Sequence, residues 1–390
     1  MTLVGTVPLS RRALLVSSAA AFGCGGAKKA IPYSGYCFVA NQGSRTVAVV
    51  DLLTFRRLPA IALPETPSAV IAHPSQPKSF VLAPQAGTVF ELDAAKLAVS
   101  RRVHAGGEAV SMKLAPDGKA LWVLCRNPGA LVEIPLDSLA PRRRIAIPDH
   151  AIDFDLSIVR PWRAAIAAGP ARLITLASLD TLAVERTVSM AVEPSGVCFQ
   201  SDGKQVISVS NADRSVTLFE AATGKTVARL PLPFAPRRYC LSADGGQLFL
   251  TGDGMDAVTI VYPYQSEIAE TVLAGRTPGA MAATGSPPGA AASDIPNYLF
   301  VTNPASNTIT VLNIDDRRLV AVVQVGQEPR EILISPDAQY ALVLNEGSGD
   351  LAVIRLYALT EPRAHRYKSA SLFTLIPVGD RPVSAAVVTL

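Results

Sequence analysis

Two stretches of the sequence repeat one pattern at a long distance from each other. Residues 298–315 read YLFVTNPASNTITVLNID, and residues 36–52 read YCFVANQGSRTVAVVDL. Each has an apolar run that ends in Asn and is followed by a short polar turn. A Thr comes next, and apolar residues follow it at alternating positions. This succession is typical of two antiparallel β-strands joined by a tight turn. The same strand pair is therefore expected near both ends of the chain.

The strand pair recurs between these two ends at a nearly constant period. Successive copies lie 42 or 43 residues apart, except for one interval of 51. The residues that open the second strand of each copy are Thr46, Thr88, Ala130, Arg172, Ser215, Ala257, Thr308 and Asp350. A unit of four short strands at this period is typical of a propeller blade. The sequence predicts an all-β fold, an eight-bladed β-propeller over residues 33–390, with seven blades as the alternative because the third and fourth units are degenerate.

The repeat unit also resembles a known family. In the seventh unit, YLFVTNPASNTITVLN is followed by VQVGQEPREILISPDAQYALVLNEGSGDLAVI. The turn APDGK at 115–119 has a counterpart in QSDGK at 200–204. These motifs resemble the YVTN family of β-propeller repeats over essentially the whole chain after its N-terminal segment. The resemblance implies the fold, an envelope or surface location and a binding role, and it implies no catalytic residue.

The two ends of the chain are expected to share one blade. The stretch YCFVAN at 36–41 matches the second strand of a blade, and VSAAVVTL at 383–390 matches the innermost strand. The C-terminus would then complete the N-terminal blade, with three strands from one end and one from the other. Such pairing leaves no exposed edge at the seam of the ring.

The first residues are interpreted as a targeting segment. Arg11 and Arg12 precede a short apolar run and resemble a twin-arginine export signal. The run stops at Cys24, which resembles the lipidated residue of a lipoprotein processing site. Residues 1–24 are thus predicted to be the export signal and 25–32 a short linker. The protein is expected in the periplasm or cell envelope, lipid-anchored to the outer rather than the inner membrane, with simple signal cleavage as the alternative.

Composition and residue spacing exclude several classes of function. The chain has 36 basic and 32 acidic residues, a balance that offers no concentrated basic face for nucleic acid. No apolar run reaches the roughly 20 residues that a membrane-spanning helix needs. The four His and the remaining Cys are scattered, so no metal site, cofactor or catalytic residue is predicted. Only DHAIDFD at 149–155 leaves an oxygen-rich cation site open.

The candidate binding residues lie on the innermost strands and on the turns that lead into them. These lead-in turns gather at one mouth of the channel, and their charged residues are Glu108, His150, Glu193, Arg237, Glu328, Arg330 and Arg381. Below them, polar channel walls are predicted from Lys113, Asp153, Asp155, Arg238 and Glu331. A concave site with convergent polar groups is the usual place for a ligand. Pairing of Lys113 with the two Asp residues across neighbouring blades is the structural alternative.

The sequence therefore predicts a binding or scaffold module that acts through its channel mouth. Its partner is an unknown protein or a small molecule, and the module is expected to be a monomer that touches the membrane only through its lipid anchor. The competing binding face is the opposite one, which carries the DGK turns and two insertions, 284–297 and 360–371. The alternative function is a periplasmic enzyme of the propeller class, lactonase-like or a cofactor-dependent oxidoreductase, that uses the central channel.

Overall fold

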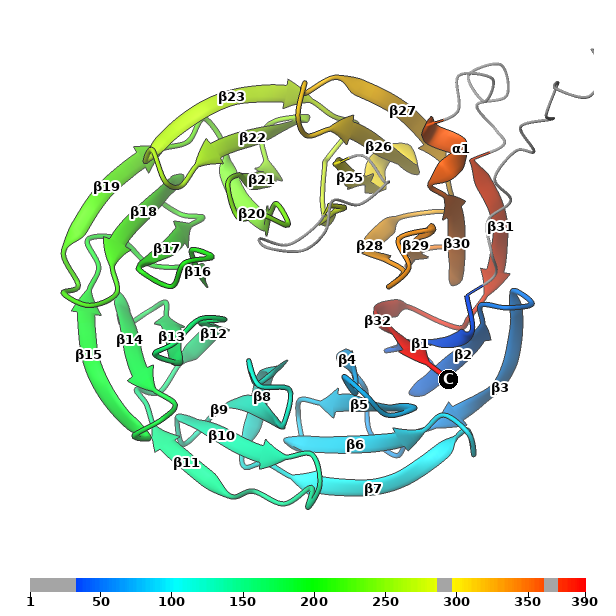
Figure 1. Ribbon diagram of the computed structural model, residues 1–390, viewed down its shortest axis with the longest axis horizontal. Helices are drawn as coiled ribbons and strands as arrows, with labels where there is room; N and C mark the ends of the chain where they lie inside the picture. Colours follow the sequence, from blue (N-terminus) through cyan, green and yellow to red (C-terminus); the bar gives the residue numbers. More distant parts are fainter. Residues whose placement is uncertain (1–32, 286–296, 361–370) are drawn as a thin grey trace, which may run out of the picture. The chain divides into compact units, whose positions relative to one another are not determined.

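Eight antiparallel sheets of four strands each follow one another along the chain and confirm the eight-bladed β-propeller over its seven-bladed alternative. The computed structural model describes residues 33–285, 297–360 and 371–390. The sheets are arranged in a ring, with β4, β8 and β12 toward the centre and β7, β11 and β15 at the rim (Figure 1). The predicted export and lipidation residues Arg11, Arg12 and Cys24, and residues 286–296 and 361–370 of the two insertions, lie outside the described residues.

The blades are numbered in chain order, and each is given from its innermost strand outward. The first to fourth blades are β32 (Pro382–Thr389), β1 (Gly35–Asn41), β2 (Thr46–Asp51), β3 (Arg56–Ala62); β4 (Ala69–Ala72), β5 (Lys78–Ala83), β6 (Thr88–Asp93), β7 (Ala98–His104); β8 (Glu108–Leu114), β9 (Ala120–Arg126), β10 (Ala130–Pro135), β11 (Arg143–Ala146); and β12 (Ala151–Leu156), β13 (Arg163–Ala168), β14 (Leu173–Ser178), β15 (Ala183–Ser189).

The fifth to eighth blades are β16 (Gly196–Phe199), β17 (Gln205–Ser210), β18 (Ser215–Glu220), β19 (Thr226–Pro231); β20 (Ala235–Leu241), β21 (Leu248–Asp253), β22 (Ala257–Tyr262), β23 (Glu267–Leu273); β24 (Met281–Ala283), β25 (Tyr298–Asn303), β26 (Thr308–Asn313), β27 (Leu319–Gln324); and β28 (Pro329–Ile334), β29 (Tyr340–Asn345), β30 (Asp350–Arg355), β31 (Leu372–Pro377). The short helix α1 (Tyr357–Thr360) and a 3₁₀ turn (Pro304–Ser306) are the helical segments in the described part of the chain, and no helix there is long and apolar enough to cross a membrane.

The first blade is closed by the two ends of the chain, as predicted. Strand β32 pairs antiparallel with β1, and Tyr36 lies opposite Val388 while Val39 lies opposite Ala385. The backbone amide of Leu390 also donates to the carbonyl of Ser34 at 3.3 Å. This pairing supplies β1 with a hydrogen-bonding partner on its inner side, so the seam of the ring has no free strand edge.

The core lies between the blades, because the second and third strands of each blade bury both faces. Phe80 and Leu82 of the second blade pack in one buried cluster with Leu121 and Val123 of the third. The outermost strands are mostly exposed, as in β3, where Ile61 is the buried residue. Such packing explains why the second and third strands of each blade are apolar on both faces instead of alternating between apolar and polar residues.

The Asn that ends the second strand of several blades fastens neighbouring blades to each other. Asn41 is fully buried, and its amide donates to Thr46 Oγ1 at 3.2 Å and to the carbonyl of Val378 in the eighth blade at 3.1 Å. Asn303 repeats the contact with Thr308 and accepts from the Gly275 amide at 2.9 Å. The Asn-to-Thr pattern of the sequence is therefore a contact within and between blades, rather than the local backbone turn expected of Asn.

Candidate functional site

A cavity of about 780 Å³ opens at the channel mouth between the sixth and eighth blades, and we call it the mouth cavity. Its walls come from the lead-in turns of β20, β24 and β28 and from the turns after β21 and β25. Four of the predicted site residues line it, namely Arg237, Arg238, Glu328 and Arg330. Asp253, Met255, Asp256 and Gly279 line it too and were not predicted.

The mouth cavity exists because the seventh blade brings no large side chain to this place. The inner strand of the sixth blade has Arg237 and Arg238 after its opening Pro, whereas the seventh blade has Gly279 and Ala280. A Cβ atom on Gly279 would lie only 2.9 Å from Thr302 Oγ1. The Gly279 carbonyl also accepts a 2.7 Å hydrogen bond from Thr251 Oγ1. The chain is thus held close both to its own blade, through Thr302, and to the sixth blade, through Thr251, and the space above it stays open.

The arginines that flank the mouth cavity differ in their partners. Arg237 pairs with Asp253, and both side chains are more than half exposed. Arg330 lies 3.5 Å from Glu328 and 3.2 Å from Glu346. The pairs with Asp253 and Glu328 are exposed and contribute only about 0–1 kcal/mol each, so a ligand can displace these carboxylates at little cost, whereas Glu346 is only 22% exposed. Arg238 makes no hydrogen bond or ion pair with any residue that the structure describes, and its guanidinium is exposed.

The polar channel wall is a bonded cluster that links four consecutive inner strands. Lys113 Nζ of β8 lies 2.7 Å from Asp155 Oδ1 of β12. The second oxygen of Asp155 accepts from the Phe199 amide of β16 at 2.8 Å. Asp153 Oδ2 accepts from the Val197 amide at 3.1 Å and from the Tyr239 hydroxyl of β20 at 2.7 Å. The structural interpretation of Lys113 and Asp155 as an ion pair between blades is therefore confirmed.

The ionisation of this cluster follows from burial and from its partners. Burial raises the pKa of Asp153 above its ordinary value, although hydrogen bonds from Tyr239 and Val197 act in the opposite direction. Burial lowers the pKa of Lys113, but the charge and hydrogen bond of Asp155 outweigh it and leave that pKa raised. Protein donors already occupy the carboxylates that the sequence left open to a cation. Among the described residues, no three His, Cys, Asp or Glu side chains converge as metal ligands would.

A glycine makes room for this cluster. A Cβ atom on Gly196 would lie 2.7 Å from Cε1 of Tyr239. Tyr239 crosses the fifth blade at this point to reach Asp153 on the fourth, and it also donates to the Val197 carbonyl at 3.0 Å. Any larger residue in place of Gly196 would push the tyrosine ring out of this contact.

The remaining predicted residues lie apart from the mouth cavity. Glu108 pairs with Arg126 at 3.2 Å, and Arg381 pairs with Glu346 at 3.3 Å. His150 and Glu193 are exposed. Glu331 lies in the channel wall, where burial raises its pKa while the charge of Arg238 acts to lower it.

Several of these residues belong to a repeated turn geometry. The residue just before the inner strand has a positive φ in three of the lead-in turns, with 64° at His150, 51° at Glu328 and 53° at Arg381. A left-handed residue at this position turns the chain into the strand. The turn fixes the direction in which these side chains leave the backbone, and of the three only Glu328 lines the mouth cavity.

The chain is similar to propeller proteins in sequence over part of its length. A family model described as "Lactonase, 7-bladed beta-propeller" matches residues 199–361. An uncharacterized WD repeat-containing protein of Synechocystis is 27% identical over 147 residues, which are 37% of this chain and 41% of that protein. A seven-bladed β-propeller protein of Mycobacterium tuberculosis is 25% identical over 156 residues, 39% of this chain and 38% of that protein. The matches thus span about two fifths of the length of these relatives.

Solved structures show the same architecture at low sequence identity. The dihydro-heme d1 dehydrogenase NirN in complex with DHE has a TM-score of 0.71 and 15% identity, and it covers 92% of this chain and 76% of its own. Hydrazine synthase of Kuenenia stuttgartiensis has a TM-score of 0.57 and 19% identity, over 74% of this chain and 95% of its own. At such identities the likeness concerns the fold alone. Together with the sequence matches, it shows that this chain has the β-propeller fold and is similar to WD-repeat and lactonase-type propellers over part of its length.

Proposed function

We propose that this protein is an exported, membrane-tethered propeller that binds a carboxylate-bearing ligand at the mouth cavity. The observation that carries the proposal is the cavity itself, in which arginines of the sixth and eighth blades flank a seventh blade that has Gly279 and Ala280 at the positions of those arginines. The YVTN-like repeats and the export-like segment with Arg11, Arg12 and Cys24 support an envelope location.

A carboxylate is the group that fits the donors of the mouth cavity. A guanidinium presents two parallel N–H donors that match the two oxygens of a carboxylate. Arg238 makes no hydrogen bond or ion pair among the described residues, and Arg237 and one side of Arg330 are held by the exposed carboxylates of Asp253 and Glu328, which a ligand can replace. The volume of about 780 Å³ is within the range of small-molecule sites.

The test is the affinity of the purified protein for mono- and dicarboxylic acids, measured by titration calorimetry. Arg237→Ala combined with Arg330→Ala is expected to weaken the tightest of these ligands more than tenfold, or about 1.4 kcal/mol. Arg57→Ala removes an exposed charge from β3 and should leave the affinity unchanged. Deletion of residues 286–293, which the sequence pattern assigns to the competing face, should keep it within threefold. If the deletion abolishes binding and the double arginine change does not, the opposite face is the binding face.

A lactonase-like enzyme is the second candidate. The segment matched by the lactonase family model, 199–361, contains every residue that lines the mouth cavity. Addition of water to a lactone breaks the ring ester bond and gives a hydroxy carboxylate and one proton, and this carboxylate would meet the same arginines. A pH-stat assay with a panel of lactones separates the two functions. Lactone turnover that disappears in Arg238→Ala would establish that the protein is a lactonase-like enzyme. Carboxylate binding without turnover would establish that it is a binding module.

A cofactor-dependent oxidoreductase remains the other enzymatic alternative, and it has a direct test. The absorption spectrum and metal content of the purified protein would reveal a bound chromophore or metal. A preparation that carries either one in stoichiometric amount would favour the oxidoreductase over the binding module.

The proposed location is tested separately from the proposed ligand. Arg11→Lys with Arg12→Lys should strand the precursor in the cytoplasm, because the twin-arginine route reads the pair itself. Labelling with radioactive palmitate should be lost in Cys24→Ala. Normal export of the Lys-Lys variant would show that the general secretory route carries the protein.

A further inference from the structure

A second cavity, of about 550 Å³, lies between the second and third blades, and we call it the interblade cavity. It is lined by the turns between β4 and β5 and between β8 and β9, and by the ends of β10 and β11. These turns lie at the ends of the inner strands away from the lead-in turns. The interblade cavity is thus on the opposite face from the mouth cavity and shares no lining residue with it.

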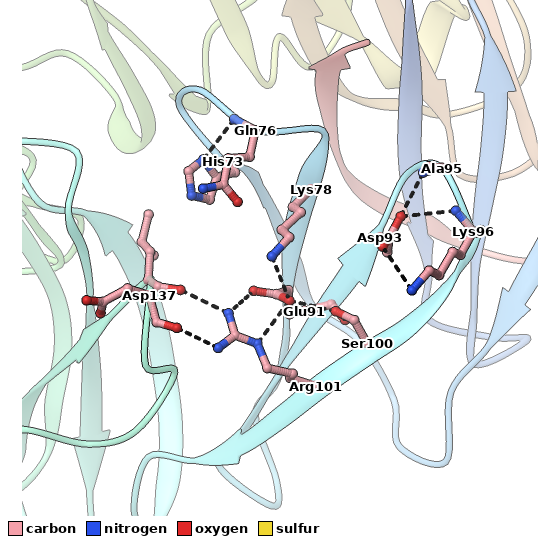
Figure 2. Close-up of polar contacts among 11 residues, drawn as sticks. His73, Gln76, Lys78, Glu91, Asp93, Ala95, Lys96, Ser100, Arg101 and Asp137 are labelled. Atoms are coloured by element: carbon pink, nitrogen blue, oxygen red, sulfur yellow. Dashed lines mark hydrogen bonds and ion pairs between the residues drawn. The ribbon is translucent and has the colours of Figure 1, made fainter.

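Each wall of the interblade cavity contains a buried carboxylate held by an arginine. Glu91 of β6 is 1% exposed and accepts hydrogen bonds from Arg101 and from Ser100 Oγ, the latter at 2.6 Å, while Lys78 Nζ lies 3.3 Å away (Figure 2). Arg101 also donates to the carbonyl of Asp137 at 2.7 Å, a contact that joins the second blade to the third. Its Nη2 donates to the carbonyl of Leu136 at 3.0 Å as well, so four of the five N–H donors of this guanidinium are engaged.

The third blade repeats the arrangement 42 residues later in the sequence. Glu133 of β10 is 6% exposed and pairs with Arg143 through Nε and through Nη2, the latter at 2.6 Å. At the equivalent position the first and fifth blades have Val49 and Leu218. A buried carboxylate is costly unless it is paired, so apolar residues are the ordinary choice here. The two Glu–Arg pairs therefore mark these two blades, and Arg101 of one pair and both members of the other line the same cavity.

The groups left unused around this cavity are hydrogen-bond donors and positive charges. The Lys119 ammonium and the Arg142 guanidinium line it, are exposed, and make no hydrogen bond or ion pair within the described part of the chain. His73 Nδ1 accepts from the backbone amides of Ser75 and Gln76, both at 3.1 Å, so the ring proton is on Nε2. Burial and the charge of Lys78 hold the pKa of His73 below its ordinary value, which keeps this ring neutral.

Each carboxylate at the interblade cavity, by contrast, already has a protein donor. Glu91 and Glu133 are held by their arginines, and Asp117 and Asp137 each accept a backbone amide on Oδ1, from Lys119 at 3.0 Å and from Ser138 at 2.6 Å. The cations here (Lys78, Arg101, Lys119, Arg142 and Arg143) outnumber these four carboxylates by one, so the unused donors favour a ligand that supplies acceptor oxygens. The donors come from separate segments of the chain, namely Lys119, Arg142, Lys78 and His73, so they can approach a ligand from several directions. The three or four oxygens of a phosphoryl group need donors from several directions, whereas a planar carboxylate does not.

From this geometry we propose that the interblade cavity is a second binding site, for the phosphoryl group of a phosphate ester. A volume of about 550 Å³ is larger than a single phosphate ion and leaves room for the organic part of the ester. The site does not depend on the function proposed for the mouth cavity, because the two cavities have no residue in common.

Calorimetric titration with inorganic phosphate, pyrophosphate and glycerol 3-phosphate tests the proposal, with succinate as the carboxylate control. Lys119→Ala with Arg142→Ala is expected to lower the affinity for the phosphate compounds at least tenfold, and these exposed residues hold no structural contact whose loss would unfold the protein. The matched control is Lys204→Ala with Arg57→Ala, in which Lys204 occupies the same DGK turn in the fifth blade. This control should bind as the unchanged protein does. Arg237→Ala with Arg330→Ala should also leave phosphate binding intact.

Three results would overturn the proposal. The first is the absence of phosphate binding up to about 10 mM. The second is an equal loss of affinity for the phosphate compounds in the Lys119/Arg142 variant and in the control variant. The third is succinate binding as tight as that of glycerol 3-phosphate. Flotation with vesicles of phosphatidylglycerol or of phosphatidylcholine distinguishes the source of the phosphoryl group. Binding to the anionic vesicles that the Lys119/Arg142 change abolishes would identify a lipid headgroup, and vesicle binding that survives this change would count against the site.

Discussion

At the scale of single residues, Glu91 shows how a buried charge is kept in a propeller blade. Burial alone would raise the pKa of this carboxyl group. The hydrogen bonds of Arg101 and Ser100, with the charges of Arg101 and Lys78, outweigh burial and lower the pKa to about 2. A carboxyl group whose pKa is depressed on folding stabilises the fold fully above its unfolded pKa of about 4.5, and this contribution is lost as pH falls through about 2.

We therefore predict that Glu91→Gln changes the acid stability of the protein. The free energy of unfolding of the unchanged protein should fall by about 3 kcal/mol more than that of the variant between pH 5 and pH 2. Urea unfolding followed by fluorescence at several pH values measures the difference. Parallel pH profiles for the two proteins would contradict the assignment of Glu91 as an ionised partner of Arg101.

The Tyr239 hydroxyl is the second residue-scale contact that can be isolated. Tyr239→Phe removes the donor to Asp153 while it keeps the ring that packs beside Gly196. The expected loss is about 1–2 kcal/mol of unfolding free energy, because a buried carboxylate loses one of its hydrogen bonds. Tyr264→Phe, at an exposed position, is the matched control and should be neutral. If both changes have the same effect on the urea midpoint, the Asp153 contact is not stabilising.

At the scale of elements, the strand β32 decides whether the ring is closed. It is the only inner partner of β1, and its residues Val388 and Ala386 pack in a cluster with Phe38 and Val81. Without β32 the amides on one side of β1 would have no strand partner, and part of this cluster would be exposed. The first blade would then present a free edge at the seam.

Removal of residues 381–390 is accordingly expected to lower the melting temperature by more than 10 °C or to prevent folding, whereas removal of Leu390 alone should have little effect. Hydrogen exchange gives the local readout. The amides of β1 should lose their protection in the truncated protein before those of β9 or β13 do. A truncated protein that melts as the full chain does would show that the pairing of β1 with β32 contributes little.

At the scale of the whole molecule, the ring predicts which circular permutants fold. The two ends of the described chain are adjacent, since the Tyr33 hydroxyl lies 2.5 Å from Thr389 Oγ1. A short linker can therefore join them. New ends after Asp117, in the turn between β8 and β9, would again place one inner strand at the C-terminus and its partner at the N-terminus. New ends after Pro148, between β11 and β12, would separate two whole blades.

We predict that the permutant opened after Asp117 is the more stable of the two, because the hydrogen bonds between β8 and β9 then still close the ring. In the permutant opened after Pro148, no strand pairing closes the ring, and contacts between blades close it, among them the Lys113–Asp155 ion pair and the hydrogen bond from the Gly129 amide to Asp149. Thermal unfolding of both purified permutants checks this order. The reverse order would mean that packing between blades, rather than pairing within a blade, holds the ends of the ring together.

The sequence by itself determined the period, the number of blades and the closure. Of the eight predicted strand starts, from Thr46 to Asp350, seven coincide with the structure. The one in the fourth blade differs by one residue, because the strand begins at Leu173 and not at Arg172. The sequence also placed Arg237 and Arg330 at one mouth and Arg238 in the channel wall just below them. These features repeat every 42 residues or so, and a repeated local pattern can be recognised without knowing what packs against it.

Only the tertiary structure decided where the cavities are and which charges are already satisfied. The mouth cavity depends on Gly279 and Ala280 of one blade being shorter than the arginines of its two neighbours, so it is a property of three blades together. An ion pair joins Lys113 to Asp155, so neither charge is free for a ligand. Two carboxylates, Glu91 and Glu133, are buried at positions where the repeat alone predicts an ordinary strand residue. The physical reason is that a strand pattern specifies which residues face inward, whereas space and charge balance depend on the side chains that adjacent blades bring to the same point.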